Sequence, residues 1–225
     1  MKLGVLFSGG KDSTYALYKA REGNEIACLI SIISKNPESY MFHTPNIELV
    51  ELQAKAIELP LIKKSTAGEK EKELKDLKDA IEEAKKKYSV RGIVTGAFAS
   101  VYQRDRIQKI CDELKLECIS PLWGKEPEKI MREMMSAGFK FMLSSIAALG
   151  LDESWLGRVL TNKDVGKLVQ LNKRFGVHIA FEGGEAESLV VDGPIFKQKI
   201  KIIKAEKKME NENTGVYSII KAELA

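Results

Sequence analysis

Short continuous apolar runs alternate with longer amphipathic stretches along the first half of the chain. Apolar runs of this kind, buried on both faces of a sheet, predict strands, and apolar residues recurring every three or four positions predict helices. The predicted strands are 3–7, 25–33, 61–64, 92–97 and 116–120, and the predicted helices are 13–21, 47–59, 69–88 and 102–114. This alternation indicates an α/β fold with a doubly wound, mostly parallel sheet.

The pattern changes after residue 123. Here the predicted helices are 126–136 and 162–175, the predicted strands are 139–144, 179–181, 188–191, 195–205 and 217–222, and the polar stretch 207–214 is predicted to be an exposed hairpin loop. Strands with few helices between them are typical of an α+β arrangement. We therefore expect two domains, a larger one over residues 1–124 and a smaller α+β domain over residues 125–225.

Composition and charge limit the function classes. The 225 residues are 44% hydrophobic and 30% charged, and the net charge is +4, too small to indicate nucleic-acid binding by itself. The longest apolar stretches, 26–33 and 142–151, are too short or too interrupted for a membrane span, which needs about 20 residues. The first residues also lack the features of a secretory signal. We expect a cytoplasmic protein without a membrane or direct nucleic-acid partner.

The three cysteines, Cys28, Cys111 and Cys118, form no CxxC motif, which suits a reducing compartment. Cys28 lies in an apolar run and Cys111 on an amphipathic helix. Both positions favour buried structural thiols over the alternative of catalytic or metal-binding ones.

A phosphate-binding loop is predicted between the first strand and the first helix, with the sequence Ser8, Gly9, Gly10, Lys11, Asp12, Ser13. Glycines let the backbone approach a ligand, and the amides of the first helical turn point toward an anion. The lysine and the two serine hydroxyls add charge and donors. The spacing is wrong for a Walker A loop. The alternative is that the two glycines only form a tight turn and that Asp12 or Ser13 caps the helix. It is less favoured because strand, loop and helix follow in order.

Three further segments carry polar groups. They are 39–46 (SYMFHTPN), 96–106 (GAFASVYQRDR) and 182–194 (EGGEAESLVVDGP). The first two follow the second and fourth predicted strands, and the phosphate loop follows the first. Because ligands bind beyond the carboxyl ends of such strands, we expect these segments to meet at one edge of the sheet.

The segment SGGKDS is the PP-loop sequence of the N-type ATP pyrophosphatase superfamily, which this chain resembles. Together with the three segments above, the chain resembles the diphthine-ammonia ligase family from residue 1 to about residue 196. The family's EGGE motif and DGPxF ending match 182–185 and 192–196. The chain departs from the commoner form at Ala186, where an aromatic residue is frequent, and at Ser188, where threonine is.

This resemblance implies an ATP-dependent, AMP-forming ligase. The carboxylate of diphthine, a modified histidine on translation elongation factor two, would be adenylated by ATP with release of pyrophosphate. Ammonium would then displace AMP to leave the diphthamide amide. With no glutaminase signature in the chain, free ammonium is the expected nitrogen source. The oligomeric state is open, with a homodimer as one alternative.

Roles follow for the first domain. Lys11 and the amides of Gly9 and Gly10 would stabilise charge on the β and γ phosphates, and Asp12 would hold the loop or bind Mg²⁺. Residues expected to bind ATP are Ser8, Gly9, Gly10, Lys11, Asp12, Ser13, His43, Gly96 and Ala97. For His43 the alternative is a local hydrogen bond. For Gly96 and Ala97 it is close packing of the following helix.

Residues expected to bind the substrate are Tyr102, Gln103, Arg104, Glu182, Gly183, Gly184, Glu185 and Glu187. Arg104 and Arg106, two positions apart on a helix, should point in different directions, with Arg104 the better candidate for gripping an anion. The carboxylates would pair with the trimethylammonium group of diphthine or deprotonate ammonium. The catalytic candidates are Lys11, Asp12, Glu182 and Glu185. Solvated loop acids are the alternative.

Two other functions compete with the ligase. A tRNA-modifying enzyme such as a thiolase uses the same loop but needs paired catalytic cysteines or iron–sulfur ligands. A non-catalytic ATP or AMP sensor needs only the loop. The run 155–158 (WLGR) is either a substrate loop or an ordinary helix end.

Overall fold

The computed structural model describes residues 1–34, 36, 46–68 and 72–225 of the chain. It divides into two compact units, Met1–Trp123 and Gly124–Ala225, and each is described by itself.

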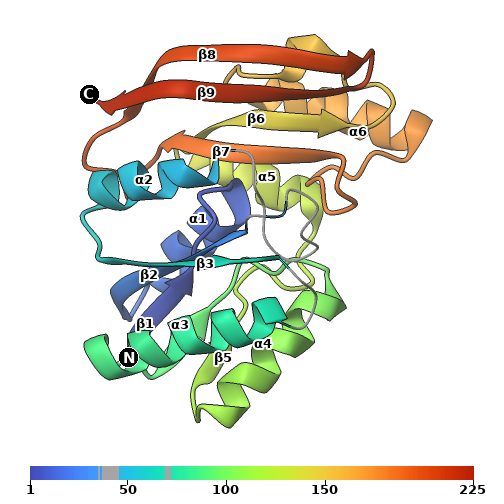
Figure 1. Cartoon of the computed structure of the whole chain (residues 1–225). Helices are drawn as coiled ribbons and strands as arrows, with labels where there is room; N and C mark the ends of the chain where they lie inside the picture. The colour runs from blue at the N-terminus through green and yellow to red at the C-terminus, as the bar shows by residue number, and fades with distance from the viewer. Residues whose placement is uncertain (35, 37–45, 69–71) are drawn as a thin grey trace. The chain divides into compact units, whose positions relative to one another are not determined.

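Within the described residues of the first unit, five strands form one parallel sheet in the order β3-β2-β1-β4-β5 (Figure 1). The strands are β1 (Lys2–Leu6), β2 (Glu25–Ser34), β3 (Leu61–Thr66), β4 (Gly92–Val94) and β5 (Glu117–Ile119). From β1 the chain adds β2 and β3 on one side of β1, and then crosses back to add β4 and β5 on the other side of β1. The carboxyl ends of β1 and β4 therefore form the switch point of the sheet, where doubly wound folds bind ligands.

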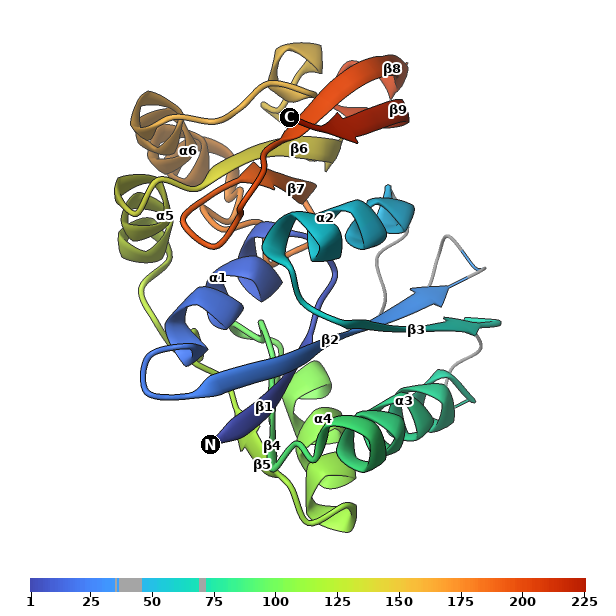
Figure 2. The ribbon, with the colours of Figure 1, turned by 90° about the vertical axis from the view of Figure 1, so that its left-hand side faces the viewer.

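Helices cover both faces of this sheet. They are α1 (Lys11–Ala20), α2 (Val50–Ile57), preceded by the short 3₁₀ helix η1 (Ile47–Leu49), α3 (Lys72–Tyr88) and α4 (Val101–Glu113). Figure 2 shows α1 and α2 on one face, and α3 and α4 on the other. Apolar side chains from α3, α4 and the strands, among them Leu77, Ile81, Ile93 and Ile110, form a buried core on the second face.

The predicted order of strands and helices in this unit is confirmed, and so is the doubly wound parallel sheet. The largest difference is the fourth strand, predicted to reach residue 97 but ending at Val94. The backbone turns there because the side chain of Thr95 accepts a hydrogen bond from the amide of Ala97 at 3.1 Å. Residues 95–100 therefore form a loop at the strand end.

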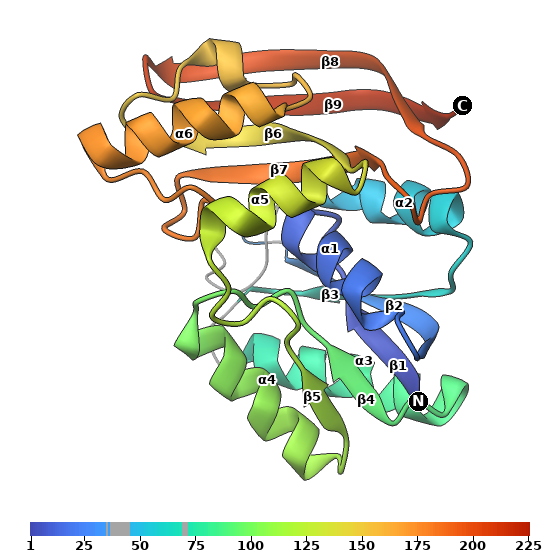
Figure 3. The ribbon, with the colours of Figure 1, turned by 180° about the vertical axis from the view of Figure 1, so that it is seen from behind.

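In the described second unit, four strands form an antiparallel sheet in the order β7-β6-β9-β8. They are β6 (Lys140–Ala147), β7 (Ala186–Asp192), β8 (Ile200–Asn211) and β9 (Thr214–Leu224), accompanied by α5 (Pro127–Ser136), the 3₁₀ helix η2 (Glu153–Trp155) and α6 (Asn162–Phe175). In Figure 3, α5 and α6 cover the same face of this sheet. The predicted α+β arrangement is confirmed.

Three predictions in the second unit are wrong. Residues 179–181 form a turn in which Phe181 has a positive φ of 62°, and β8 begins at Ile200 rather than at residue 195. The stretch 207–214 is mostly strand, because β8 runs to Asn211 and β9 starts at Thr214. Its many charged residues lie on exposed strands, so polarity alone does not distinguish them from a loop.

In the part of the chain that the structure describes, no helix has both the length and the apolar character needed to cross a membrane. Trp155, at the end of η2, is buried, so the run 155–158 begins with a packing residue.

Candidate active site

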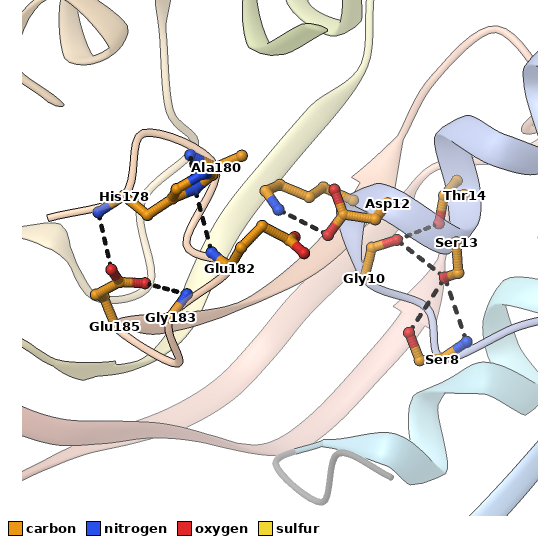
Figure 4. Close-up of polar contacts among 11 residues, drawn as sticks. Ser8, Gly10, Asp12, Ser13, Thr14, His178, Ala180, Glu182, Gly183 and Glu185 are labelled. Carbon is orange, nitrogen blue, oxygen red and sulfur yellow. Dashed lines mark hydrogen bonds and ion pairs between the residues drawn. The ribbon is translucent and has the colours of Figure 1, made fainter. Parts of the chain in front are cut away.

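The phosphate loop leaves β1 and enters α1 as predicted. Gly10 is the N-cap of α1, in an extended conformation and without a side-chain cap, so neither Asp12 nor Ser13 plays that part. The hydroxyl of Ser13 accepts a hydrogen bond from the amide of Ser8 at 3.2 Å and donates one to the carbonyl of Gly10 at 3.2 Å (Figure 4). The two serines thus stabilise the bend of the loop. The amides of the first turn of α1 stay a predicted binding site for an anion.

Two glycines in this region permit contacts that no other residue allows. Gly9 has a φ of 78°, and a Cβ atom there would lie 2.0 Å from Oε1 of Gln53. A Cβ atom on Gly96 would lie 2.7 Å from the amide nitrogen of Ser13. The segment after β4 therefore packs directly on the first turn of α1. The predicted alternative for Gly96, close packing, is correct, but its partner is α1 and not the following helix, and ATP binding by Gly96 and Ala97 stays a prediction.

Lys11 and Asp12 form an ion pair at the start of α1. The side chain of Lys11 is only 3% exposed, and its Nζ lies 2.7 Å from Oδ2 of Asp12. The carboxylate is favourably placed near the positive end of the helix dipole. Oδ1 of Asp12 is also buried, and it has no hydrogen-bond partner among the described residues. A buried carboxylate oxygen of this kind is normally paired with a hydrogen-bond donor or a cation, and none of the described residues supplies one.

That unpartnered oxygen fits a Mg²⁺ ion, which in nucleotide sites takes one or two carboxylates together with phosphate oxygens and water. Within the described ranges, no group of three or more histidines, cysteines or acids is placed to hold a metal. Asp12 is thus the described residue that would hold Mg²⁺ if the ion binds here.

Helix α4 carries the two predicted arginines. Ser100 caps α4, because its hydroxyl accepts a hydrogen bond from the amide of Gln103 at 3.3 Å. The guanidinium carbon of Arg104 lies 4.1 Å from the centre of the Trp123 ring, and Asp105 pairs with Arg104 at 2.9 Å. Arg106 instead stacks on the Tyr102 ring at 3.4 Å. The different directions predicted for Arg104 and Arg106 are confirmed.

In the second unit, one carboxylate and one histidine organise the loop before β7. Oε1 of Glu185 accepts a hydrogen bond from the amide of His178, and Oε2 accepts one from the amide of Gly183, both at 2.8 Å (Figure 4). Nδ1 of His178 accepts hydrogen bonds from the amides of Ala180 at 3.2 Å and Glu182 at 3.3 Å. The His178 proton therefore lies on Nε2.

These contacts assign different positions to the three predicted acids. Glu185 uses both carboxylate oxygens within the loop, which supports a structural role, and its catalytic role stays a prediction. Glu182 lies in the turn, and Glu187 is on β7, where it pairs with Ser145 of β6. Gly184 has a φ of 83°, which allows the tight turn between them. His43 lies outside the described residues.

Several residues that contact the phosphate loop, Arg104 or the turn before β7 were not predicted to do so. The principal ones are Gln53, Thr14, Trp123 and His178. A glutamine within the predicted helix 47–59 does not by itself indicate a site residue, because its role becomes clear only from its contact with Gly9, 44 positions away. Nothing in the sequence connects His178 to the turn that follows it.

Cys28 and Cys111 are buried in the first unit as expected, and Cys118 is half-buried. Burial raises the pKa of Cys28 to about 12, which keeps this thiol protonated at neutral pH. Cys111 and Cys118 are seven positions apart in sequence but interact through a hydrogen bond, which raises the pKa of Cys111 and lowers that of Cys118. Both are free thiols, and they pack with the core beneath α4.

The parallel sheet, its switch point and the loop define a nucleotide-binding protein of the PP-loop class. The diphthamide synthase N-terminal domain family matches residues 1–118, and the diphthamide synthase C-terminal domain family matches residues 126–225.

Curated relatives named diphthine–ammonia ligase include the Mus musculus protein, 33% identical over 94% of this chain and 86% of its own length. The Homo sapiens protein is 34% identical over 92% of this chain and 84% of its own length. A solved structure described as a predicted tRNA methyltransferase subunit from Methanocaldococcus jannaschii shares 21% identity over 77% of this chain and 88% of that chain, with a TM-score of 0.38. The chain belongs to the diphthamide synthase family and is an ATP-dependent ligase.

Proposed function

We propose that this chain converts diphthine on translation elongation factor two into diphthamide, using ATP and ammonium. The observation that carries the proposal is the ion pair between buried Lys11 and half-buried Asp12, in a glycine loop at the switch point of the sheet, within a chain whose relatives are named diphthine–ammonia ligases. The loop supplies a site for the phosphates of ATP, and the family supplies the acceptor.

The reaction has two steps. A carboxylate oxygen of diphthine attacks the α phosphorus of ATP, the bond from that phosphorus to the bridging oxygen breaks, and pyrophosphate leaves. Ammonia then attacks the acyl carbon of the adenylate, AMP leaves with the bridging oxygen, and the proton released from nitrogen goes to a base. Both leaving groups carry their own negative charge away, so the enzyme's main task is electrostatic.

Within the loop, Lys11 and the amides beside Gly9 and Gly10 stabilise the charge that develops on pyrophosphate. Lys11 is held by Asp12 at 2.7 Å and is nearly fully buried, so its charge is fixed in position before ATP binds. Fixed charges of this kind stabilise a transition state without reorganisation during the reaction. Mg²⁺, held by Oδ1 of Asp12 and the phosphates, would add further positive charge.

The loop of the second unit is proposed to receive the cationic parts of the reaction. Glu182 and Glu187 are the candidates for pairing with the trimethylammonium group or taking a proton from ammonium. Glu185 is proposed to hold that loop in shape through the two amide hydrogen bonds. Arg104, stacked on Trp123, is proposed to contact the carboxylate of the substrate.

An isotope experiment tests the adenylate step. Diphthine-bearing elongation factor with oxygen-18 in the diphthine carboxylate is incubated with the protein, ATP, Mg²⁺ and ammonium. We expect AMP as the nucleotide product, with one labelled oxygen in its phosphate. Release of ADP, with the label in inorganic phosphate, would instead indicate an acyl phosphate and contradict the proposal.

A further inference from the structure

Three backbone carbonyls in or next to the phosphate loop accept hydrogen bonds from buried side chains. The carbonyl of Phe7 accepts a hydrogen bond from Ser31 at 2.5 Å, that of Gly9 from Nε2 of Gln53 at 2.8 Å, and that of Gly10 from Thr14 at 2.8 Å. Ser31 is 1% exposed, and Gln53 and Thr14 are 0% exposed. Three donors from three different elements, β2, α2 and α1, therefore converge on consecutive parts of one loop.

The direction of each carbonyl matters because a carbonyl oxygen repels phosphate and an amide hydrogen attracts it. In a planar trans peptide, the carbonyl of one residue and the amide of the next point in opposite directions. When the Gly9 carbonyl points toward Gln53, the amide of Gly10 must point away from Gln53. Gly10 is the N-cap of α1, so its amide lies beside the amides of the first helical turn.

We propose that Gln53 is a positioning residue for the phosphates of ATP: by binding the Gly9 carbonyl, it turns the Gly10 amide toward the ligand. This rests on the proposed function only in assigning the loop to ATP phosphates. Gln53 does not itself contact the ligand in this account.

Two features of the site support this role over simple core packing. Gln53 is a fully buried polar residue, and such residues are costly unless their groups are hydrogen-bonded. Its amide group also lies so close to Gly9 that a Cβ atom there would be 2.0 Å from Oε1. The glutamine and the glycine are therefore a matched pair that joins α2 to a loop 44 positions earlier in the sequence.

The test replaces Gln53 with methionine, which has a similar volume but no donor. ATP affinity is measured by equilibrium titration with Mg²⁺ and without elongation factor, and amide exchange at residues 8–13 is followed by mass spectrometry. We expect Gln53→Met to weaken ATP binding about tenfold, as for loss of one hydrogen bond that orients the loop, and to speed exchange at the Gly10 amide.

Ile57→Ala, one turn further along α2, is the matched control. Ile57 is 7% exposed, so this change should lower the melting temperature through lost packing while leaving ATP affinity unchanged. Gln53→Asn, which keeps the amide group one methylene further from Gly9, is the second variant and should show weakened ATP binding and faster exchange at Gly10.

Wild-type ATP affinity in folded Gln53→Met or Gln53→Asn would overturn the inference, and so would an equal loss of affinity in Ile57→Ala. Because no elongation factor is present, this outcome is independent of whether the chain makes diphthamide.

Discussion

At the residue scale, the phosphate site depends more on what glycines permit than on reactive side chains. Gly9 needs a positive φ and close contact with Gln53, and Gly96 needs room against the first turn of α1. The sequence predicted the loop because its six residues are contiguous and lie between a strand and a helix. It did not predict Gln53, since its partner lies 44 positions away and only the folded chain brings them together.

Gly9→Ala should disrupt this arrangement. An alanine at φ of 78° is strained by about 1 kcal/mol, and its Cβ would displace the amide group of Gln53. We expect ATP affinity, measured by titration, to fall at least tenfold, by the reasoning used for Gln53. Gly23→Ala has a similar φ of 75° but nothing within 4 Å, so it should lose comparable stability without losing ATP affinity. Equal effects of the two changes on ATP binding would contradict the account.

Lys11→Ala should remove the fixed positive charge of the loop. Losing one group that stabilises transition-state charge lowers kcat on the order of 100-fold, so AMP formation in a coupled assay should fall by about that factor. Lys19→Ala, in the last turn of the same helix, is the control and should keep near wild-type activity. AMP formation by Lys11→Ala at the wild-type rate would show that the loop lysine has no catalytic role.

At the element scale, helices and buried strands were easier to predict than turns and exposed strands. The sequences of α3 and α6 keep an amphipathic helical pattern over many residues. The bounds predicted for α6 are those observed. The β8–β9 hairpin was misjudged because its charged residues lie on exposed strands, and the short run 179–181 was misjudged because a three-residue apolar segment has no period to measure. The His178 turn therefore became visible only in the structure.

The start of α6 offers a pH-dependent test of stability. Burial of Asp164 would by itself raise its pKa, but hydrogen bonds from Arg158 and Thr161 outweigh burial and hold the pKa at about 2. The unfolded value is about 3.9, so this carboxylate contributes about 2 kcal/mol of stability above pH 4, which is lost as the pH falls from about 4 to about 2.

Chemical denaturation of Asp164→Asn should therefore show a loss of about 2 kcal/mol at pH 7 relative to wild type, shrinking toward zero near pH 2. Glu128→Gln removes a half-exposed pair with Arg132 on α5, and should change stability by less than about 1 kcal/mol at either pH. A loss in Asp164→Asn that is the same at pH 7 and pH 2 would argue against this assignment.

At the scale of the whole molecule, alternating strands and helices were enough to predict the sheet of the first unit, because doubly wound topology follows from local pattern and connection rules. The substrate was not predictable in that way. Nothing in the spacing of Glu182, Glu185 and Glu187 specifies diphthine, and the assignment rests on family membership. The geometry of the loop supports phosphate binding, whereas family membership supports diphthine as the acceptor. A single measurement should therefore test ATP use and diphthine modification together.

The central claim is that ATP bound at the loop activates a diphthine carboxylate for attack by ammonia. The protein is incubated with ATP, Mg²⁺, nitrogen-15 ammonium and diphthine-bearing elongation factor two, and the modified histidine is examined by mass spectrometry while AMP is measured. We expect one labelled nitrogen per modified histidine, formed together with one AMP and only when ATP is present. AMP formation without labelled amide, or at the same rate without the elongation factor, would contradict it.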